Sequence, residues 1–531
     1  MKKLLLFLSI SICGIVYAQA PPWQWAKSTG GTPIGQNNIS TDVNGNVFVT
    51  GNSGSYISIV KYDASGNLLW AKSALANRVL GVATDPYGNA FITGCFDQDS
   101  IIIGTTTLTN TNVGSLDFYV VKYDANGNIL WVTAAGGTDN DGSQGISTDT
   151  SGNVYVTGTF HSDSINFGTT TITNVGGNWD VFTVKYNGSG NVLWAKSEGG
   201  SGGESSRAIS TDVSGNVFVT GDFQSSSMTI GTDTITNSGI GGIGDNIFLL
   251  KYDASGNVLW ARAAGGPHYF DQSHAVCADV NGNVFITGYF HSDSINFGTT
   301  TLTNVDTNNN NTFFVTKYDA SGNVIWAKSA GVANSAGEGI STDANKNVFV
   351  AGSFADSSIT FGTTILTNAG HDDMFIVKYD DSGNVIWAKS AGGTNPDLAT
   401  AISVSPGGNV YVTGYSTSDS INFGTTTLFG SGIFTAKLGG TTSIEEDFIN
   451  SEFKVYPNPT SGKFQLILNN SNSQASTIIL YNILGEIVYK STTTQLTNYP
   501  LTIDLTMKPK GIYLVRMQQG DKIYQSKIIV E

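Results

Sequence analysis

The sequence is short of charge and of long hydrophobic runs. Charged residues make up 13% of its 531 residues, whereas glycine occurs 64 times and aromatic residues reach 11%. A chain this aromatic is not disordered, and its glycine content is typical of short strands joined by tight turns. After the N-terminal segment, no stretch is apolar enough to cross a membrane as a helix. The length allows two or three domains.

Cysteine is almost absent as well. Of three cysteines, Cys13 lies in the N-terminal apolar segment, and Cys95 and Cys277 fall in different repeats at different positions. An exported protein is permitted to form disulfides, but this placement predicts two unpaired, buried thiols.

The main body of the chain also lacks a basic surface. The formal net charge is −15, and it is unevenly distributed. Residues 453–531 contain eight basic and four acidic residues, so this segment carries +4 and the remainder −19. An acidic main body repels phosphate backbones, which argues against nucleic acid as a partner.

Recognisable catalytic motifs are missing. There is no G-x-S-x-G nucleophile elbow, no H-E-x-x-H zinc motif and no phosphate-binding loop. His161 and His291 lie in near-identical segments of repeats that are not neighbours, which argues against a shared metal site. The sequence therefore predicts no catalytic residue, no metal and no cofactor.

The N-terminus has the organisation of a secretory signal peptide. Two lysines precede an apolar run at 4–16, which is too short to span a bilayer. We expect cleavage between Ala18 and Gln19, because Pro21 is a poor residue directly after a cleavage site. Removal of residues 1–18 would leave an exported protein.

Two motifs alternate along the chain. The first is KYDASGNVLWAR (251–262), which recurs at 61–72, 122–133, 185–196, 317–328 and 378–389. The second is DVSGNVFVTG (212–221), with further copies at 42–51, 85–94, 149–158, 279–288, 343–352 and 405–414. After a first step of 43 residues, the second motif recurs every 62–67 residues. Such regular recurrence predicts one structural unit per repeat, packed on its neighbours.

Each repeat is predicted to form four antiparallel strands. In the third repeat these are GISTD (145–149), NVYVTG (153–158), VFTVKY (181–186) and NVLWAKS (191–197). The second and fourth are apolar on both faces, which predicts sheets stacked as the blades of a β-propeller.

The D-x-x-G-N segments are predicted to be tight turns. The Asp side chain would accept backbone hydrogen bonds, and glycine would supply a positive φ. A calcium loop is the alternative interpretation, but Ser53 stands where an EF-hand-type loop needs a glutamate.

The seventh repeat lacks its fourth strand, and the N-terminus supplies a matching sequence. After IFTAKL (433–438) the chain runs into two glycines, whereas WQWAKSTGG (23–31) matches WAKSAGG (387–393). Seven second-strand motifs and seven repeated Trp positions, including Trp25, predict an all-β, seven-bladed propeller at 19–440, closed by the N-terminal strand. We interpret the repeated Trp residues as packing between blades.

Binding residues are expected where the repeat is broken. Meander topology places the D-x-x-G-N turns on one face, the turn face, and the crossings between blades and the inserts such as SDSINFGTTTITN (162–174) on the other, the insert face. Loops on a rigid scaffold concentrate binding, so we expect it on the insert face. Aromatics beside carboxylates suit sugars or peptides, and ordinary rim variation is the alternative. The candidate residues are Trp179, His268, Tyr269, Asp271, His274, His371 and Asp372.

The end of the chain has a different pattern. A linker at 441–452 precedes FKVYPNPTSGKFQLIL (453–468), and alternating apolar segments follow. This pattern predicts a small β-sandwich, Ig-like in its arrangement, at 453–531.

Both parts of the chain resemble known families. Residues 23–438 resemble the SBBP-type β-propeller repeats of secreted bacterial proteins, with Lys346 in place of a turn glycine and Ser405 in place of a turn Asp. The C-terminal part resembles the type A sorting domain of the type IX (Por) secretion system of Bacteroidetes. The matching residues are Tyr456, Pro457, Asn458, Pro459, Gly462, Gly511, Tyr513 and Lys527.

The second resemblance implies a destination. It implies export to the periplasm, transport across the outer membrane by the type IX machinery, and then release or attachment at the cell surface. We expect a monomeric propeller that binds a glycan or a surface protein. The alternatives are a secreted polysaccharide hydrolase or lyase and a structural or adhesion component. A hydrolase needs a carboxylate pair within about 5–10 Å, and the lack of a non-repeated carboxylate near a strand end favours binding.

Overall fold

The structure is a computed structural model, and it consists of strands in two compact units. It describes residues 20–30, 37–239, 244–267, 270–304, 310–331, 334–439, 453–468, 476–482, 487–493, 501–519 and 522–530. The predicted signal peptide and the candidates His268 and Tyr269 lie outside these residues. The two units are Met1–Thr441 and Thr442–Glu531. Within the described ranges, no helix is long and apolar enough to span a membrane.

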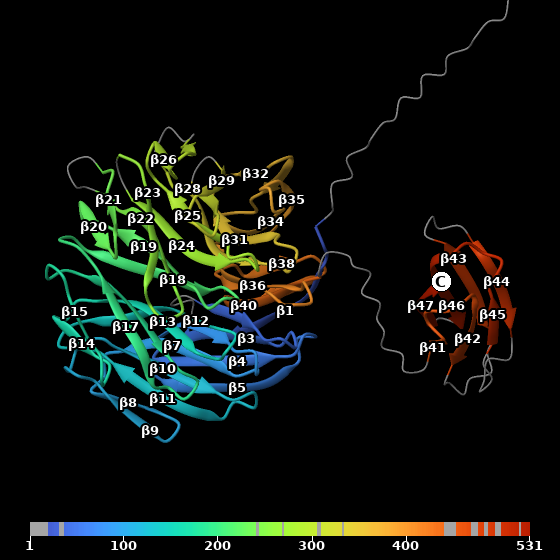
Figure 1. Cartoon of the computed structure of the whole chain (residues 1–531), viewed down its shortest axis with the longest axis horizontal. Coiled ribbons are helices and arrows are strands. Elements are labelled where there is room, and N and C mark those ends of the chain that lie inside the picture. Colours follow the sequence, from blue (N-terminus) through green and yellow to red (C-terminus); the bar gives the residue numbers. More distant parts are fainter. Residues whose placement is uncertain are drawn as a thin grey trace, which may run out of the picture. The chain divides into compact units, whose positions relative to one another are not determined.

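The first unit contains seven four-stranded antiparallel sheets, which are the blades of a propeller (Figure 1). The innermost strands of blades 1 to 7 are β2 (Asn38–Thr41), β6 (Arg78–Thr84), β12 (Asp141–Thr148), β18 (Glu204–Thr211), β24 (Asp271–Ala278), β30 (Ser335–Thr342) and β36 (Asp397–Val404). The second strands are β3 (Val47–Ser53), β7 (Ala90–Phe96), β13 (Val154–Phe160), β19 (Val217–Phe223), β25 (Val284–Phe290), β31 (Val348–Phe354) and β37 (Val410–Ser416).

The outer half of each blade is equally regular. The third strands are β4 (Tyr56–Tyr62), β10 (Asp117–Tyr123), β16 (Asp180–Tyr186), β22 (Asn246–Tyr252), β28 (Thr312–Tyr318), β34 (Asp373–Tyr379) and β40 (Gly432–Leu438). The fourth strands are β5 (Leu68–Leu75), β11 (Ile129–Ala135), β17 (Val192–Glu198), β23 (Val258–Ala264), β29 (Val324–Ala330), β35 (Val385–Ala391) and, in blade 7, β1 (Trp23–Gly30).

The ring closes through its N-terminal strand, as the sequence predicts. β1 pairs antiparallel with β40, and Trp25 lies opposite Lys437. The innermost strands contact one another in a full circle, from β2 through β36 and back to β2. The closed ring leaves no blade without a neighbour on either side.

The repeated Trp residues join neighbouring blades, which confirms their interpretation as packing. The indole nitrogen of Trp260 donates to the carbonyl of Ala320 in the third-to-fourth turn of the next blade, at 3.1 Å. Gly322 in that turn has a φ of +80°, and a Cβ there would lie 3.0 Å from the ring of Trp260. Trp387 has no such acceptor, and its indole nitrogen is buried without a hydrogen bond. The reason is topological, because β1 and β40 of blade 7 are not joined by a turn.

The D-x-x-G-N segments are hydrogen-bonded turns. In the turn that starts at Asp124, one carboxylate oxygen accepts the backbone N–H groups of Asn126 and Asn128, and the other accepts the Asn128 side chain. The carboxylate is therefore used by its own turn, which supports the turn interpretation over the calcium loop. Lys346 adopts a φ of +64° at the glycine position of its turn.

The inserts form small hairpins at the outer edge of the ring (Figure 1). They are β8 (Ser100–Ile103) with β9 (Thr106–Thr109), β14 (Ser164–Asn166) with β15 (Thr171–Thr173), β20 (Ser227–Ile230) with β21 (Asp233–Thr236), β26 (Ser294–Asn296) with β27 (Thr301–Thr303), β32 (Ser358–Phe361) with β33 (Thr364–Thr367), and β38 (Ser420–Phe423) with β39 (Thr426–Phe429). They contact fourth strands, such as β15 with β17 and β33 with β35. The hairpins therefore surround the rim, away from the central axis.

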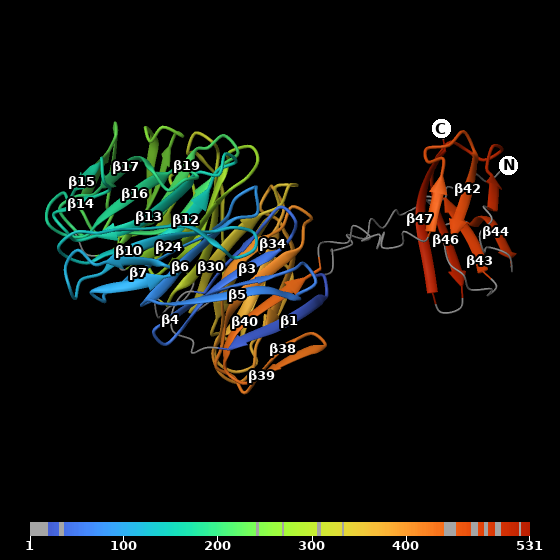
Figure 2. The same cartoon turned by 90° about the horizontal axis from the view of Figure 1, so that it is seen from below.

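The second unit is a two-sheet β-sandwich, labelled in Figure 2. One sheet contains β41 (Phe453–Tyr456), β42 (Lys463–Leu468) and β45 (Leu501–Asp504). The other contains β44 (Ile487–Thr493), β43 (Ser476–Asn482), β46 (Gly511–Gln519) and β47 (Lys522–Val530). Side chains of both sheets, including Phe464, Leu466, Ile478 and Val515, form one buried core.

Candidate functional site

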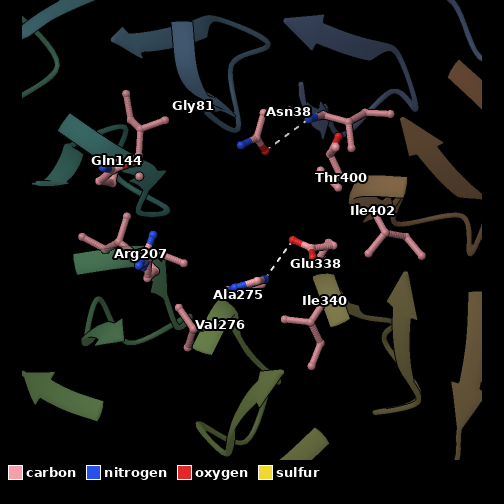
Figure 3. Close-up of a pocket in the computed structure, with 18 of the residues that line it drawn as sticks. Asn38, Gly81, Gln144, Arg207, Ala275, Val276, Glu338, Ile340, Thr400 and Ile402 are labelled. Atoms are coloured by element: carbon pink, nitrogen blue, oxygen red, sulfur yellow. Dashed lines mark hydrogen bonds and ion pairs between the residues drawn. The ribbon is translucent and has the colours of Figure 1, made fainter. Parts of the chain in front are cut away.

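A channel runs along the axis of the propeller, and the innermost strands line it. Its narrow part is a cavity of about 240 Å³ with residues from all seven blades in its wall. Figure 3 shows Asn38, Gln144, Arg207, Glu338 and Thr400 arranged around the open centre.

One residue in each of six innermost strands is set apart by a β-bulge. The register of each strand shifts by one residue at the same place, and a bulge turns the extra side chain out of the regular ladder. The extra residues are Leu80, Gln144, Arg207, His274, Glu338 and Thr400. No two of them are alike. By contrast, the position two residues later is Val or Ile in every blade.

The bulge residues of blades 4 to 6 belong to a polar network. His274 Nδ1 lies 2.8 Å from Glu338 Oε2, and the exposed fractions of these side chains are 20% and 26%. The ring of Tyr289 meets the His274 ring edge-on, with centroids 5.3 Å apart. The Tyr289 hydroxyl donates to the side chain of Gln272 at 2.9 Å. Tyr289 thus supports the pair of His274 and Glu338 on one side, and the pair is open to the channel on the other.

A second ion pair lies beside this network. Arg207 donates through Nε to Asp222 at 2.7 Å, and the Asp222 side chain is buried. Burial raises the pKa of Asp222, although the Arg207 guanidinium opposes this. Burial acts in the same direction on Glu338, but there His274 and Arg207 together outweigh it and the pKa of Glu338 is lowered. Glu338 is therefore held as a carboxylate.

The channel widens towards the insert face into a mouth of about 510 Å³. Arg78, Gln144, Trp179, Arg207 and Tyr415 are among the residues that line it. Burial raises the pKa of Tyr415, and the carboxylates of Glu338 and Asp372 raise it further.

Trp179 reaches the mouth from a position that recurs in other blades. This position precedes the third strand, and its backbone carbonyl accepts the N–H of the first residue of the next innermost strand. The residues found there are Leu116, Trp179, Asp245, Asn311 and Asp372. Two residues that the sequence singled out separately, Trp179 and Asp372, are therefore equivalent positions in different blades.

The other predicted candidates have different surroundings. His274 lines the channel. Asp271 is fully buried, and its carboxylate accepts hydrogen bonds from Gly266, His291 and Ser292. Asp271 begins strand β24 and does not lie in the crossing between blades 4 and 5, and its buried carboxylate is not accessible to a ligand in this structure. His371 is exposed but lines neither cavity.

Sequence reasoning missed three channel residues, Gln144, Arg207 and Glu338. It placed the start of the innermost strand at 145, whereas β12 begins at Asp141 because the preceding residues also pair with β13. Glu338 is a non-repeated carboxylate in the channel wall, and it lies in the middle of β30, whereas the sequence argument considered only carboxylates near strand ends. Aligning the repeats on the turn Asp reveals these residues, because they lie five positions before it.

No metal centre is recognisable in the part of the chain that the structure describes. No group of three or more His, Cys, Asp or Glu side chains is placed there to hold an ion. Cys95 and Cys277 are both buried and unpaired, as predicted.

In the C-terminal unit, the Y-P-N-P segment is tied to the last strand. Asn458 accepts the N–H of Ile529 at 2.9 Å, whereas Tyr456 is 69% exposed. Gly462 has a φ of +114°, and its carbonyl accepts the N–H of Leu505. Tyr513 is buried and donates to the Pro509 carbonyl. Gly511 begins β46, and Lys527 lies in β47.

Residues 454–531 match a family model described as "Secretion system C-terminal sorting domain". The C-terminal β-sandwich is a sorting domain. Its presence indicates secretion through the type IX system, to the cell surface or beyond.

The propeller has weaker likenesses. An uncharacterized WD repeat-containing protein of Acanthamoeba polyphaga mimivirus is 26% identical over 69% of this chain and 32% of its own length. The regulatory protein FlaEY of Caulobacter vibrioides is 28% identical over 29% of this chain and 16% of its own. The chain thus spans about a third or less of the length of these relatives.

Solved structures similar to the chain include other propellers. The Dos1 propeller has a TM-score of 0.37 at 10% identity, with 74% of each chain covered. A quinonprotein alcohol dehydrogenase-like protein from Bacteroides thetaiotaomicron has a TM-score of 0.35 at 11% identity, with 68% of each covered.

Proposed function

We propose that the exported chain is a propeller scaffold that binds a glycan or a protein partner at the mouth of its channel. The observation that carries this proposal is the ring of unlike bulge residues in an otherwise repeated wall. A residue needed for folding recurs from blade to blade, whereas a ligand needs different groups at different points around it. The sorting domain delivers this scaffold to the cell surface or beyond.

A second candidate function rests on the pair of His274 and Glu338. A histidine held by a carboxylate and flanked by Tyr289 is an arrangement that moves protons in acid–base catalysis. A polysaccharide lyase or hydrolase would use such a pair at the side of the channel. A surface or adhesion role without a small ligand remains the third function to be distinguished.

Binding and turnover are tested together on the mature chain. A glycan and surface-protein array should give specific binding that the His274→Ala variant weakens, while a polysaccharide-degradation screen shows no products. Products that disappear in both His274→Ala and Glu338→Gln would replace the binding function with the enzyme. If the array gives no binding signal and the screen gives no products, the surface or adhesion role is favoured.

Delivery is tested by removing residues 453–531. The propeller should then fold but accumulate in the periplasm, because the transport machinery no longer recognises it. Fractionation and surface labelling measure this, with the full chain as the control. Truncated propeller found at the cell surface would contradict delivery by the sorting domain.

A further inference from the structure

One side of the channel mouth carries two arginines, although the protein as a whole is acidic. Arg78 and Arg207 both line the same cavity of about 510 Å³, in a chain whose formal net charge is −15. They come from blades 2 and 4, and Gln144 of the intervening blade 3 lies between them in the ring order. We refer to Arg78, Gln144, Trp179 and Arg207 as the basic sector.

The guanidinium groups of the basic sector retain donors for a ligand. Arg78 is exposed, and its side chain makes no hydrogen bond or ion pair with the residues that the structure describes. Arg207 uses Nε for Asp222, and its two terminal nitrogens have no acceptor among the described residues. A guanidinium with free terminal N–H groups matches the two oxygens of a carboxylate or the oxygens of a sulfate.

Trp179 gives the basic sector an aromatic wall. Its side chain is 38% exposed, and its ring packs against His161 with centroids 5.1 Å apart. His161 is itself held by Asp139, with Nδ1 2.8 Å from the carboxylate, so the exposed ring is supported from behind. A supported indole presents an apolar face that suits a sugar ring.

Gln144 completes the basic sector with an amide. Its side chain makes no hydrogen bond to the described protein, and the amide offers both donors and an acceptor. Sugar hydroxyls are donors and acceptors as well, so one amide serves adjacent hydroxyls. The residues that line the cavity come from blades 2, 3, 4 and 7. Its volume of about 510 Å³ lies within the range of small-ligand sites, which suits a short saccharide.

We propose that the basic sector binds an anionic saccharide, one that carries a carboxylate or sulfate on its sugar ring. This inference deepens the proposed function and rests on binding at the mouth. The indole packs on the ring, the amide binds hydroxyls, and the two arginines bind the acidic group. An acidic peptide would use the arginines but would need neither Trp179 nor Gln144.

The test is titration calorimetry on the mature chain with four probes. These are a uronic acid trisaccharide, a sulfated galactose trisaccharide, neutral galactotriose and hexaglutamate. At least one anionic saccharide should bind tenfold or more tightly than galactotriose. Arg78→Gln should weaken that affinity about tenfold, and Trp179→Ala should weaken it by a similar factor. Arg262→Gln, in the outer strand β23, is the matched control and should leave the affinity unchanged.

Each contrary result has a distinct meaning. Equal affinity for neutral and anionic saccharides would overturn the anionic preference but leave glycan binding intact. Binding of hexaglutamate without any saccharide would overturn the inference in favour of a protein partner. No binding of these probes, alongside a neutral glycan found on the array, would also overturn it. If the array also gives no binding signal, the proposal that the protein binds a glycan is contradicted as well. Unchanged melting of both variants excludes unfolding as the cause of lost affinity.

Discussion

The two faces of the propeller use the same residue types in opposite ways. On the turn face, Asp124 accepts hydrogen bonds from the Asn128 side chain and backbone, and these lower its pKa. On the insert face, Asp141 and Asp271 also accept several hydrogen bonds, but burial outweighs them and raises the pKa of each to about 6. On the turn face the carboxylates belong to repeated turns, and even a partly buried one such as Asp149 keeps a lowered pKa. On the insert face, buried carboxylates with a raised pKa lie among residues that differ from blade to blade.

This difference indicates at which positions the fold tolerates different side chains. The repeated Trp and the turn that accepts its hydrogen bond fit each other at six blade junctions, as at Trp260, so substitution in one repeat breaks a contact with the next. Five of the bulge residues line the channel instead, and their contacts, such as the pair of His274 and Glu338, differ from blade to blade and do not belong to the repeated packing. Variation accumulates where the packing constraint is absent.

The strongest test of the framework is removal of residues 19–31. The deletion takes away β1 and exposes the edge of β40, so the ring opens. We expect the melting temperature to fall by about 15 °C or more, measured by calorimetry. Adding the peptide 19–31 in trans should restore part of the loss. A chain that melts at an unchanged temperature without the peptide would contradict closure.

Substituting one repeated Trp and one non-repeated Trp by alanine compares how much each contributes to stability. Trp260→Ala removes a buried ring and an inter-blade hydrogen bond, and should cost about 3 kcal/mol of unfolding free energy. Trp179→Ala removes a half-exposed ring and should cost about 1 kcal/mol or less. Denaturant unfolding measures both. Equal costs would mean that Trp179 is also part of the framework.

The pKa difference between the faces predicts how stability depends on pH. Burial raises the pKa of Asp141 and Asp373 to about 6 and that of Asp180 to about 7. These groups bind protons in the folded protein at pH values where the unfolded chain has lost them, so their contribution to stability falls as pH rises through 6 to 7. The melting temperature should be a few degrees higher at pH 5 than at pH 8.

A matched variant identifies the source of that pH dependence. Asp271→Asn removes one of the buried carboxylates, so its melting temperature should change less between pH 5 and pH 8 than that of the parent chain. The lowered pKa of Asp124 affects stability only at still lower pH. A melting temperature that rises from pH 5 to pH 8 would contradict the assignment.

The smallest expected effect concerns the turn in which Lys346 replaces glycine. Lys346 has a φ of +64°, which strains a residue with a side chain, so Lys346→Gly should stabilise the protein by about 1 kcal/mol. Gly282 occupies the same turn position in blade 5 with a φ of +76°, and Gly282→Lys should destabilise by a similar amount. Chemical unfolding compares the two. A gain for both substitutions would show that backbone strain does not govern this position.

The sequence by itself determined the framework of this protein. The period of the two motifs, the displaced Trp25 and the Y-P-N-P segment predict the four-stranded blades, the ring closure and the sorting domain. The blades and the ring closure depend on local hydrogen bonding and on packing that recurs from repeat to repeat, so their sequence pattern occurs several times in the chain. The sorting domain occurs once and is predicted from its family resemblance instead. Because the two motifs recur, the architecture of the propeller can be predicted without a structure.

Only the tertiary structure decided which residues form the site. Arg207, His274 and Glu338 are more than 60 residues apart from one to the next, and they meet because three bulges turn them into one channel. The same structure removes Asp271 from the site by burying it, although it lies three residues before His274. Neighbours in sequence point to opposite sides of a strand, whereas equivalent positions in successive blades share one surface.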